Sequence, residues 1–491
     1  MNRFALTALA LVLAMAPASQ TQAQTQSPPV IVSGVAPGAT APAEPPREWI
    51  DKTTGHHVVR ISDEAGSTSN YFNVNSFTPD GQWMAYSSPS GIMALNLKTH
   101  EKKLILPGRV SLLFVGHKTG TVYYTTGLEQ TQGHDANSPH VPGTAAAAAA
   151  TQGASAQGAP AKTPMADRDR RGPRDLMGYD INTGQSRKIV SLQPGYSIET
   201  VNADETLFAG ARNTGAGAQG IAAQSMMGTR DPGDEVGLDG KKLTYAEGRE
   251  VQINRRLMQK IPMEIFTVDA KTGAIKTVTA STDWLNHLQF SPTDPDLLLY
   301  CHEGNWHIVD RLWLVNVKTL AKPKLLHVRT MNMEIAGHEW WSADGKTIWY
   351  DLQTPRGVDF WVAGYRVADA HRTWYHMDQN DWGVHFNQSP DASVFSSDGG
   401  DSEMAAHAPD GKYLYLLHPN KVPDVAGIHA ANSGDLIEPG FFTAEKLVDL
   451  NNHNYRLEPN ATFTPDGKWL VFRSNMWGPS HVYAVELTKA Q

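Results

Sequence analysis

The 491-residue sequence lacks several features that would point to common classes of protein. It has a single cysteine, Cys301, so the chain cannot form an intramolecular disulfide. No apolar run approaches the roughly 20 residues that span a bilayer, which argues against a membrane-spanning helix. Formal net charge is -8, with 42 basic and 50 acidic side chains and no long run of one sign, which argues against tight binding to nucleic acid.

Familiar catalytic signatures are also missing. The sequence has no Gly-x-x-x-x-Gly-Lys-Ser/Thr phosphate-binding loop, no Gly-x-Ser-x-Gly elbow and no cysteine-rich metal knuckle. Any catalytic site must therefore be recognised from other patterns.

The N-terminus has the pattern of an exported protein. Residues 1–23 combine an arginine, an apolar run and small residues in the order of a secretory signal. Residues 24–46 are rich in Pro, Ala, Thr and Ser, which predicts a disordered tether. We therefore expect the mature protein in the periplasm or outside the cell.

A turn motif recurs along the chain. An apolar or aromatic residue precedes a Ser/Thr/Ala-Pro/Ala-Asp-Gly turn, and a short apolar strand follows it. Proline presets the turn, aspartate bonds to its own backbone and glycine takes the positive φ, so each copy predicts a hairpin. The clearest copies are 77–81, 341–345, 407–411 and 463–467.

Short strands repeated at a spacing of several tens of residues indicate a β-propeller. We predict an all-β, seven-bladed propeller that forms a single domain over residues 47–491, with a solenoid or sandwich as the alternative. The stretch His57–Ser62 would supply the outer strand that closes the ring, and the motif at His407 an extra hairpin in the sixth blade. The predicted blades begin near Tyr71, Val110, Ser197, His287, His338, His385 and Glu458.

Two insertions interrupt the repeat. Residues 132–174 are rich in Ala, Gly and Pro, which predicts a surface loop. Within the second insertion, at about 213–262, the stretch Lys241–Ile261 has few strand formers and stops at Pro262, which predicts a helix. This helix is either a solvated decoration or a lid that places an arginine over the channel.

The position three residues before the aromatic residue of the motif, or its equivalent, is polar in four successive blades. It is filled by His287, His338, His385 and Asn460. Because blades are related by rotation, these positions should form an arc around one mouth of the channel. Strand alternation directs Glu458, two residues upstream of Asn460, to the same side. Three imidazoles, a carboxylate and an amide could bind a divalent metal or position a general base.

A second polar group lies in the connection that follows, with His302, Glu303, His307 and Arg311 expected near His287. The spacing differs from the helical His-Glu-x-x-His zinc motif, so these residues either contact substrate or make structural hydrogen bonds.

Four segments together resemble the oligogalacturonate lyase family of seven-bladed propellers. They are 284–292, 301–313, 337–341 and 458–467, and the likeness extends over most of the chain from about Tyr71 to Leu487. The Cys-His-Glu-Gly and His-Glu-Trp-Trp motifs are specific, whereas the Pro-Asp-Gly turns alone would equally suit propellers of the TolB type.

The resemblance implies β-elimination on short pectic oligosaccharides, with a manganese-like ion, a histidine base and an assisting arginine. By position, His287 matches the base and His338 matches one metal-binding histidine. The assisting arginine would be Arg255 or Arg256 in the inserted helix, and we favour Arg256.

The resemblance also implies that the remaining metal ligands have changed. Tyr455, Glu458 and Asn460 fall where the family has a glutamine and two histidines. Glu458 and Asn460 offer oxygen atoms suited to Mn²⁺, Ca²⁺ or Mg²⁺, and His453 is close enough in sequence to add a nitrogen. The predicted substrate contacts are His302, His307, Arg311, His385, Arg255 and Arg473.

The predicted function is therefore a metal-assisted lyase acting on a small anionic oligosaccharide. Two alternatives remain open. A non-catalytic periplasmic propeller could bind a sugar or a protein partner. A glycoside hydrolase would need two carboxylates across the cleft, which Glu303, Glu339 and Glu458 could supply.

Overall fold

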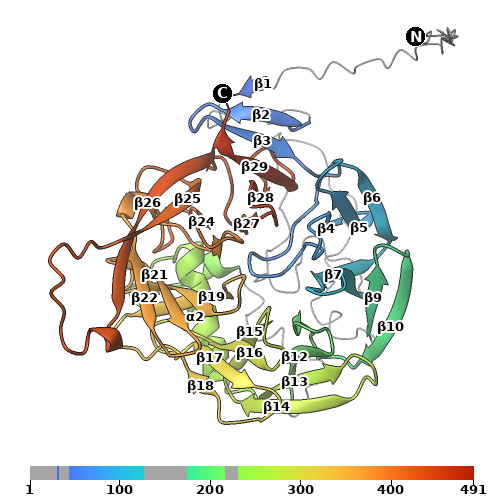
Figure 1. Ribbon diagram of the computed structural model, residues 1–491, viewed down its shortest axis with the longest axis horizontal. Helices are drawn as coiled ribbons and strands as arrows, with labels where there is room; N and C mark the ends of the chain where they lie inside the picture. Colours follow the sequence, from blue (N-terminus) through green and yellow to red (C-terminus); the bar gives the residue numbers. More distant parts are fainter. Residues whose placement is uncertain (1–29, 33–43, 127–173, 216–230, 491) are drawn as a thin grey trace, which may run out of the picture.

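Antiparallel β-sheets are arranged in a ring around a central channel (Figure 1). The structure is a computed structural model that describes residues 30–32, 44–126, 174–215 and 231–490. The predicted signal peptide, most of the predicted tether and residues 132–173 of the Ala-rich insertion lie outside the described residues. In the described part, no helix is long and apolar enough to cross a membrane.

The first four sheets in chain order run from an inner strand at the channel to an outer strand at the rim. The first contains β4 (Trp83–Ser88), β5 (Gly91–Asn96) and β6 (Lys102–Pro107). The second contains β7 (Val110–Val115), β8 (Thr121–Thr126), β9 (Arg174–Asp180) and β10 (Gln185–Leu192). The third contains β11 (Thr200–Val201), β12 (Leu207–Asn213), β13 (Met263–Asp269) and β14 (Ile275–Ser281). The fourth contains β15 (Trp284–Phe290), β16 (Leu297–Glu303), β17 (Leu312–Asn316) and β18 (Lys324–Leu325).

The next sheet has eight strands, because two four-stranded sheets are joined at their rims by the parallel pair β22–β26. One half contains β19 (Ile335–Trp341), β20 (Thr347–Gln353), β21 (Phe360–Arg366) and β22 (Arg372–His376). The other contains β23 (Phe386–Gln388), β24 (Phe395–Asp398), β25 (Tyr413–Lys421) and β26 (Glu438–Asp449). Divided at that pair, the described strands make seven groups around the ring.

The two ends of the chain meet in the last sheet. It contains β27 (Thr462–Phe463), β28 (Trp469–Ser474), β29 (His481–Lys489), β3 (His56–Arg60), β2 (Glu48–Asp51) and β1 (Val30–Val32). β3 pairs antiparallel with β29, with Val58 opposite Val485. The strand expected at 57–62 therefore closes the ring, as the sequence predicts.

The recurring motif forms the same turn in separate blades. Thr78 Oγ1 donates to Asp80 Oδ1 at 2.6 Å and accepts from the backbone N–H of Trp83, while Gly81 has a φ of 63°. Thr464 repeats the arrangement with Asp466 at 2.6 Å. The motif at 407–411 lies between β24 and β25, inside one sheet, as predicted.

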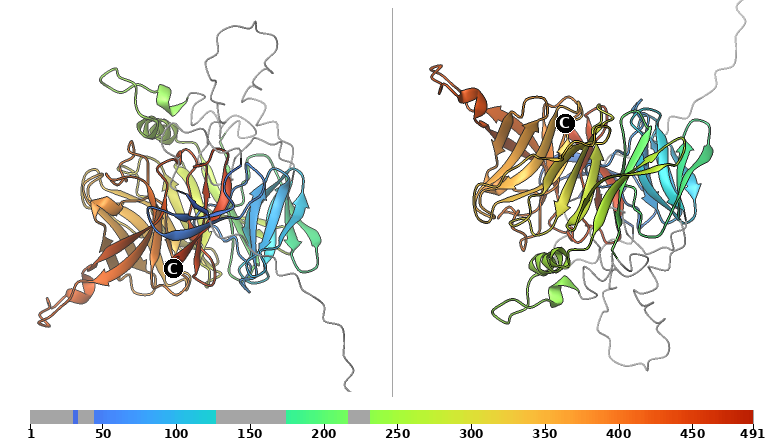
Figure 2. Two further views of the ribbon diagram at one scale, coloured as in Figure 1. Left: turned by 90° about the horizontal axis from the view of Figure 1, so that it is seen from above. Right: turned by 90° about the horizontal axis from the view of Figure 1, so that it is seen from below.

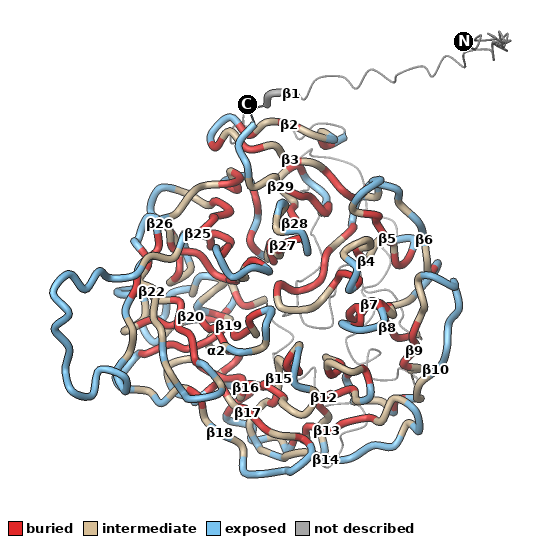
Figure 3. The backbone as a smooth tube through the Cα atoms, in the orientation of Figure 1, coloured by how far each residue is buried: buried red, intermediate tan, exposed pale blue. Residues whose placement is uncertain are grey.

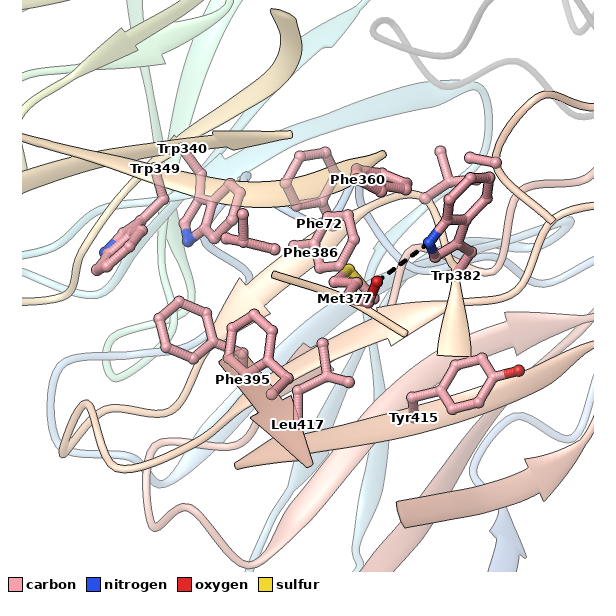
Figure 4. Packing of buried hydrophobic residues seen from close by; sticks show 14 of the residues in the cluster. Phe72, Trp340, Trp349, Phe360, Met377, Trp382, Phe386, Phe395, Tyr415 and Leu417 are labelled. Atoms are coloured by element: carbon pink, nitrogen blue, oxygen red, sulfur yellow. Dashed lines mark hydrogen bonds between the residues drawn. The ribbon is translucent and has the colours of Figure 1, made fainter. Parts of the chain in front are cut away.

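The core lies between neighbouring blades, and the exposed residues concentrate in outer loops (Figure 3). Between the blades of β19–β22 and β23–β26, aromatic rings fill the space (Figure 4). Trp340 stacks on Phe386 with ring centroids 6.3 Å apart, and Trp349 meets Phe395 edge to face at 5.0 Å. This packing fixes the relative positions of the two inner strands β19 and β23.

The predicted helix is α2 (Tyr245–Met258), and it stands outside one face of the ring (Figure 2). Thr244 begins it with a capping box, because its side chain accepts from the N–H of Glu247 and the Glu247 carboxylate accepts from the N–H of Thr244. Three 3₁₀ turns complete the described helical elements: η2 (Pro232–Asp234), η3 (Gln379–Asp381) and η4 (Ser433–Asp435).

Candidate functional site

A cavity of about 290 Å³ lies where the inner strands begin, with α2 on one side of it. The helix contributes Tyr245, Arg249, Glu250 and Ile253 to the wall. The side chains that could carry chemistry in the cavity come from several blades: His287, Glu303, Arg311, His338, His385 and Glu458. The structure therefore brings most of the predicted arc to one place.

Left-handed backbone occurs within two inner strands, β15 and β19, and just before a third, β27. His287, His338 and Asn460 have φ values of 52°, 45° and 50°. At the first two positions the ladder to the second strand also shifts register, as in a β-bulge. A non-glycine residue with positive φ is strained, and such strain concentrates where a side chain must be aimed in a particular direction. The predicted equivalence of these positions is therefore visible in the backbone itself.

His287 is held by a buried ionic network. Its Nε2 lies 3.3 Å from Glu303 Oε2, and Glu303 Oε1 accepts from Arg311 at 2.8 Å. Arg311 Nε also donates to Glu339 at 3.1 Å. Burial alone would raise the pKa of Glu303, but the charge of Arg311 and the bond from His287 hold it well below its usual range. An ionised Glu303 accepts Nε2–H and leaves the lone pair of His287 on Nδ1.

Only part of the second predicted polar group lines the cavity. Arg311 lines the cavity, but its hydrogen bonds go to Glu303 and Glu339. His302 instead bonds to Asp283 at 3.0 Å and packs against Trp313, and neither His302 nor His307 lines the cavity.

Two further histidines are each oriented by a buried aspartate. His338 Nδ1 lies 2.8 Å from Asp351 Oδ2, and His385 Nδ1 lies 3.3 Å from both oxygens of Asp398. A carboxylate that accepts Nδ1–H fixes the tautomer whose lone pair is on Nε2. The two rings are neighbours, with centroids 4.8 Å apart.

Glu458 completes this group. Its Oε2 lies 3.9 Å from His385 Nε2. In the described part of the chain, Oε2 is buried and has no hydrogen-bond partner. Burial opposes protonation of His385, but the charges of Asp398 and Glu458 outweigh it and raise the pKa of His385.

The other two predicted metal ligands do not line the cavity. Asn460 uses its side chain on the protein, because Oδ1 accepts from the N–H of Phe72 and Nδ2 donates to the carbonyl of Glu458. His453 has both ring nitrogens engaged, one with Ser474 Oγ at 2.9 Å and the other with the carbonyl of Leu457. Burial lowers the pKa of His453 to about 4, as expected of a neutral structural histidine.

Arg473 is likewise occupied within the protein. It is buried and donates to the carbonyl of Glu458 at 2.7 Å and to Thr68 Oγ1 at 2.9 Å. The Arg473 side chain therefore supports the segment that carries Glu458 and does not line the cavity.

The predicted arginines of α2, Arg255 and Arg256, do not line the cavity. Arg255 forms an ion pair with Glu235 at 3.0 Å. Arg256 is 1% exposed beside Met263 and Trp284, and burial lowers its pKa to about 10. The helical arginine that lines the cavity is Arg249, which has no carboxylate partner among the described residues.

Helix α2 is attached to the ring by residues from two different blades. Arg356, which follows β20, pairs with Glu250 through distances of 2.7 and 2.5 Å. Arg456, close to Glu458, lies over the ring of Tyr245 at 4.5 Å. Both arginines also line the cavity.

A separate group of donor atoms surrounds His287. In the described chain, the donor atoms of His287, Cys301 and Glu303 lie within 4.8 Å of one another. Glu303 is already paired with Arg311, and burial raises the pKa of the Cys301 thiol well above its usual range. These residues are therefore a poor site for a cation.

Comparisons with known proteins agree on one family. Residues 236–491 match the family model described as oligogalacturonate lyase. An oligogalacturonide lyase of Pectobacterium atrosepticum is 23% identical over 231 residues, which are 45% of this chain and 55% of that protein. An oligogalacturonate lyase of Dickeya dadantii is 23% identical over 235 residues, with the same two shares. The chain thus spans about half the length of the curated relatives it matches.

Solved structures share the fold over nearly the whole chain. An oligogalacturonate lyase in complex with manganese has a TM-score of 0.60 at 18% identity and covers 90% of this chain and 96% of its own. An oligogalacturonate lyase from Vibrio parahaemolyticus has a TM-score of 0.61 at 17% identity and covers 92% and 98%.

Proposed function

Because this chain belongs to the oligogalacturonate lyase family, we propose that it cleaves short uronate-containing oligosaccharides by metal-assisted β-elimination. One observation carries the proposal: His287, held by a buried carboxylate, shares a cavity with His338 and His385, each held by a buried aspartate. A base and a site for a cation are the two components that this reaction needs.

The donor types of three residues that line the cavity suit a divalent ion. Two imidazoles with lone pairs on Nε2 and a buried carboxylate oxygen without a partner make a mixed nitrogen and oxygen donor set. Aspartates behind the histidines are the usual outer partners of metal-binding imidazoles. We propose His338, His385 and Glu458 as the ligands. This set replaces Asn460 and His453, whose polar atoms are used elsewhere.

The reaction follows from these positions. A bound divalent ion would neutralise the uronate carboxylate and so make the C5 proton more acidic. His287 then removes that proton, while Glu303 stabilises the imidazolium that forms. Arg249 is the proposed guanidinium for the substrate carboxylate, because it lines the cavity and has no carboxylate partner within the described chain. The glycosidic oxygen leaves from C4 and a double bond forms between C4 and C5.

The arrangement of the carboxylates argues against a glycoside hydrolase. Glu303 and Glu339 both bond to Arg311, and Glu303 is held ionised. A general acid for hydrolysis would need a raised pKa. Glu303, Glu339 and Glu458 therefore do not supply the required pair.

The deciding experiment is an assay of the purified protein on a panel of uronate oligosaccharides that differ in sugar and linkage. Ultraviolet absorbance of the unsaturated product should rise with time. A chelator that removes the metal should stop this rise, and adding the metal back should restore it. Absence of product across the panel from protein that contains metal would contradict the proposal and favour a binding protein.

We also propose that the mature protein acts in the periplasm or outside the cell, because residues 1–23 have the pattern of a secretory signal. Detection of the mature N-terminus after export would test this.

A further inference from the structure

The loop between β3 and β4 enters the central channel, where it contributes Tyr71 to the cavity (Figure 1). The centroid of the Tyr71 ring lies 5.7 Å from that of His287 and 5.2 Å from that of His385. Tyr71 therefore stands between the proposed base and the proposed metal ligands, although it comes from a blade that contributes neither.

The position of the loop is fixed from several sides. The N–H of Phe72 donates to Asn460 Oδ1, and the carbonyl of Phe72 accepts from Asn387 Nδ2 at 2.7 Å. The rings of Tyr71 and Phe72 pack with centroids 4.7 Å apart. These contacts leave the Tyr71 ring little freedom, which is the condition for a preorganised catalytic group.

The hydroxyl of Tyr71 is not used by the protein. Among the described residues, none accepts a hydrogen bond from it. Tyr455, another buried tyrosine of the same cavity, differs because its hydroxyl donates to Asp398 at 2.6 Å. Tyr71 lines the cavity, so a hydroxyl without a partner among the described residues is available to a ligand oxygen.

We propose that Tyr71 donates a proton to the departing glycosidic oxygen during β-elimination, an inference that rests on the proposed function. His287 takes the proton from C5, the C5–H electron pair becomes the C4–C5 double bond, and the C4–O4 bond breaks. O4 takes the Tyr71 proton and leaves as a hydroxyl group. The proton on His287 then returns to the Tyr71 oxygen through solvent, so no water and no net proton are consumed.

The stereochemistry of the reaction supports a second proton-transfer group. In a 4-linked galacturonate, the C5 proton and O4 lie on opposite faces of the ring, so one imidazole cannot serve both atoms. An alkoxide is also a poor leaving group unless it is protonated as the bond breaks. Tyr71 lines the same cavity as His287 and its hydroxyl has no partner among the described residues, so it is the group proposed for this second transfer.

The test compares wild type with Tyr71→Phe on two substrates. One is an oligogalacturonate, and the other is a galacturonide with 4-nitrophenol linked through oxygen at C4, which leaves without a proton. We expect Tyr71→Phe to lower kcat on the oligosaccharide by about 10²–10⁴-fold and to keep kcat on the nitrophenyl substrate within about threefold of wild type. An equal loss on both substrates, or no loss on either, would overturn the assignment.

Two controls separate the possible failures. Tyr86→Phe removes the hydroxyl of another buried tyrosine, in β4 and outside the cavity, and should leave both rates unchanged. Metal content and melting temperature of Tyr71→Phe should match those of wild type. Wild-type protein inactive on both substrates would refute the proposed function itself, whereas an active wild type with uniform loss in Tyr71→Phe would refute only the role of Tyr71.

Discussion

In two blades, a histidine within or just before the inner strand bonds to the aspartate thirteen positions later on the second strand. His338 pairs with Asp351 and His385 with Asp398 in this way. In the last blade the same two positions hold Asn460 and Arg473. The last blade thus has neither the histidine nor the aspartate that would orient it, and the Asn460 side chain bonds to the protein instead.

At the level of single residues, substitution of the proposed base and substitution of a proposed metal ligand should have different effects on kcat and on metal content. His287→Ala should lower kcat by about 10²–10⁴-fold with metal content unchanged, because His287 is the proposed base and is not one of the proposed metal ligands. His338→Ala should lose the metal, because Asp351 then orients no ligand. Elemental analysis and steady-state kinetics on the two variants check both. Near-normal activity in His287→Ala would mean that another group is the base.

The arginines of α2 provide a second residue-level prediction. Arg249→Ala should reduce kcat/KM by about 10–100-fold, the usual cost of a lost hydrogen bond to a charged group. Arg255→Ala is the matched control, since Arg255 bonds to Glu235 outside the cavity and its loss should leave kcat/KM within about twofold. The reverse result would restore Arg255 as the arginine that assists the reaction.

At the level of elements, α2 depends on tertiary contacts for its place over the cavity. Glu250 pairs with Arg356 of the ring, and Tyr245 packs under Arg456. The helix presents few apolar side chains to the ring, so these two contacts contribute much of the energy that holds the helix in place. A single substitution at one of these contacts should therefore affect the position of the helix.

Glu250→Gln should loosen the helix without unfolding the ring. We expect trypsin to cleave after Arg255 or Arg256 about tenfold faster, because loss of a half-buried ion pair favours local opening. The melting temperature should be unchanged, as the blades do not depend on this contact. Glu247→Gln, within the capping box but away from the ring, is the comparison variant, and equal cleavage in both would mean that helix fraying dominates.

For the whole molecule, stability rests on closing the ring between chain ends. β3 and β29 are more than 400 residues apart in sequence, yet they pair along one edge. The side chains of β3 alternate in burial, and Val58 is fully buried against the last blade, whereas Val59 is half-exposed. This strand fastens the first part of the chain to the last.

Val58→Asp should destabilise the entire propeller, because it places an unpaired charge in the core of the closing sheet. We expect a loss of several kcal/mol, about 3–5, seen as a lower midpoint in chemical denaturation. Val59→Asp puts the same charge on the half-exposed face and should cost about 1 kcal/mol or less. Equal losses in the free energy of unfolding for the two variants would show that the buried face of β3 does not stabilise the ring.

The sequence by itself determined the repeated turn, the order of strands, the closing strand, the inserted helix and the arc of polar residues at the channel mouth. These follow from local chemistry and from the equivalence of repeats, which a linear pattern preserves. Only the tertiary structure decided that His385 faces Glu458 while Asn460 and His453 turn to the protein, and that Arg249, not Arg256, lines the cavity. It also brought Tyr71 from a distant loop to His287. The physical reason is that these contacts join residues from different blades. Which side chains touch depends on how the blades are placed around the ring, and the spacing of residues along the sequence does not give that placement.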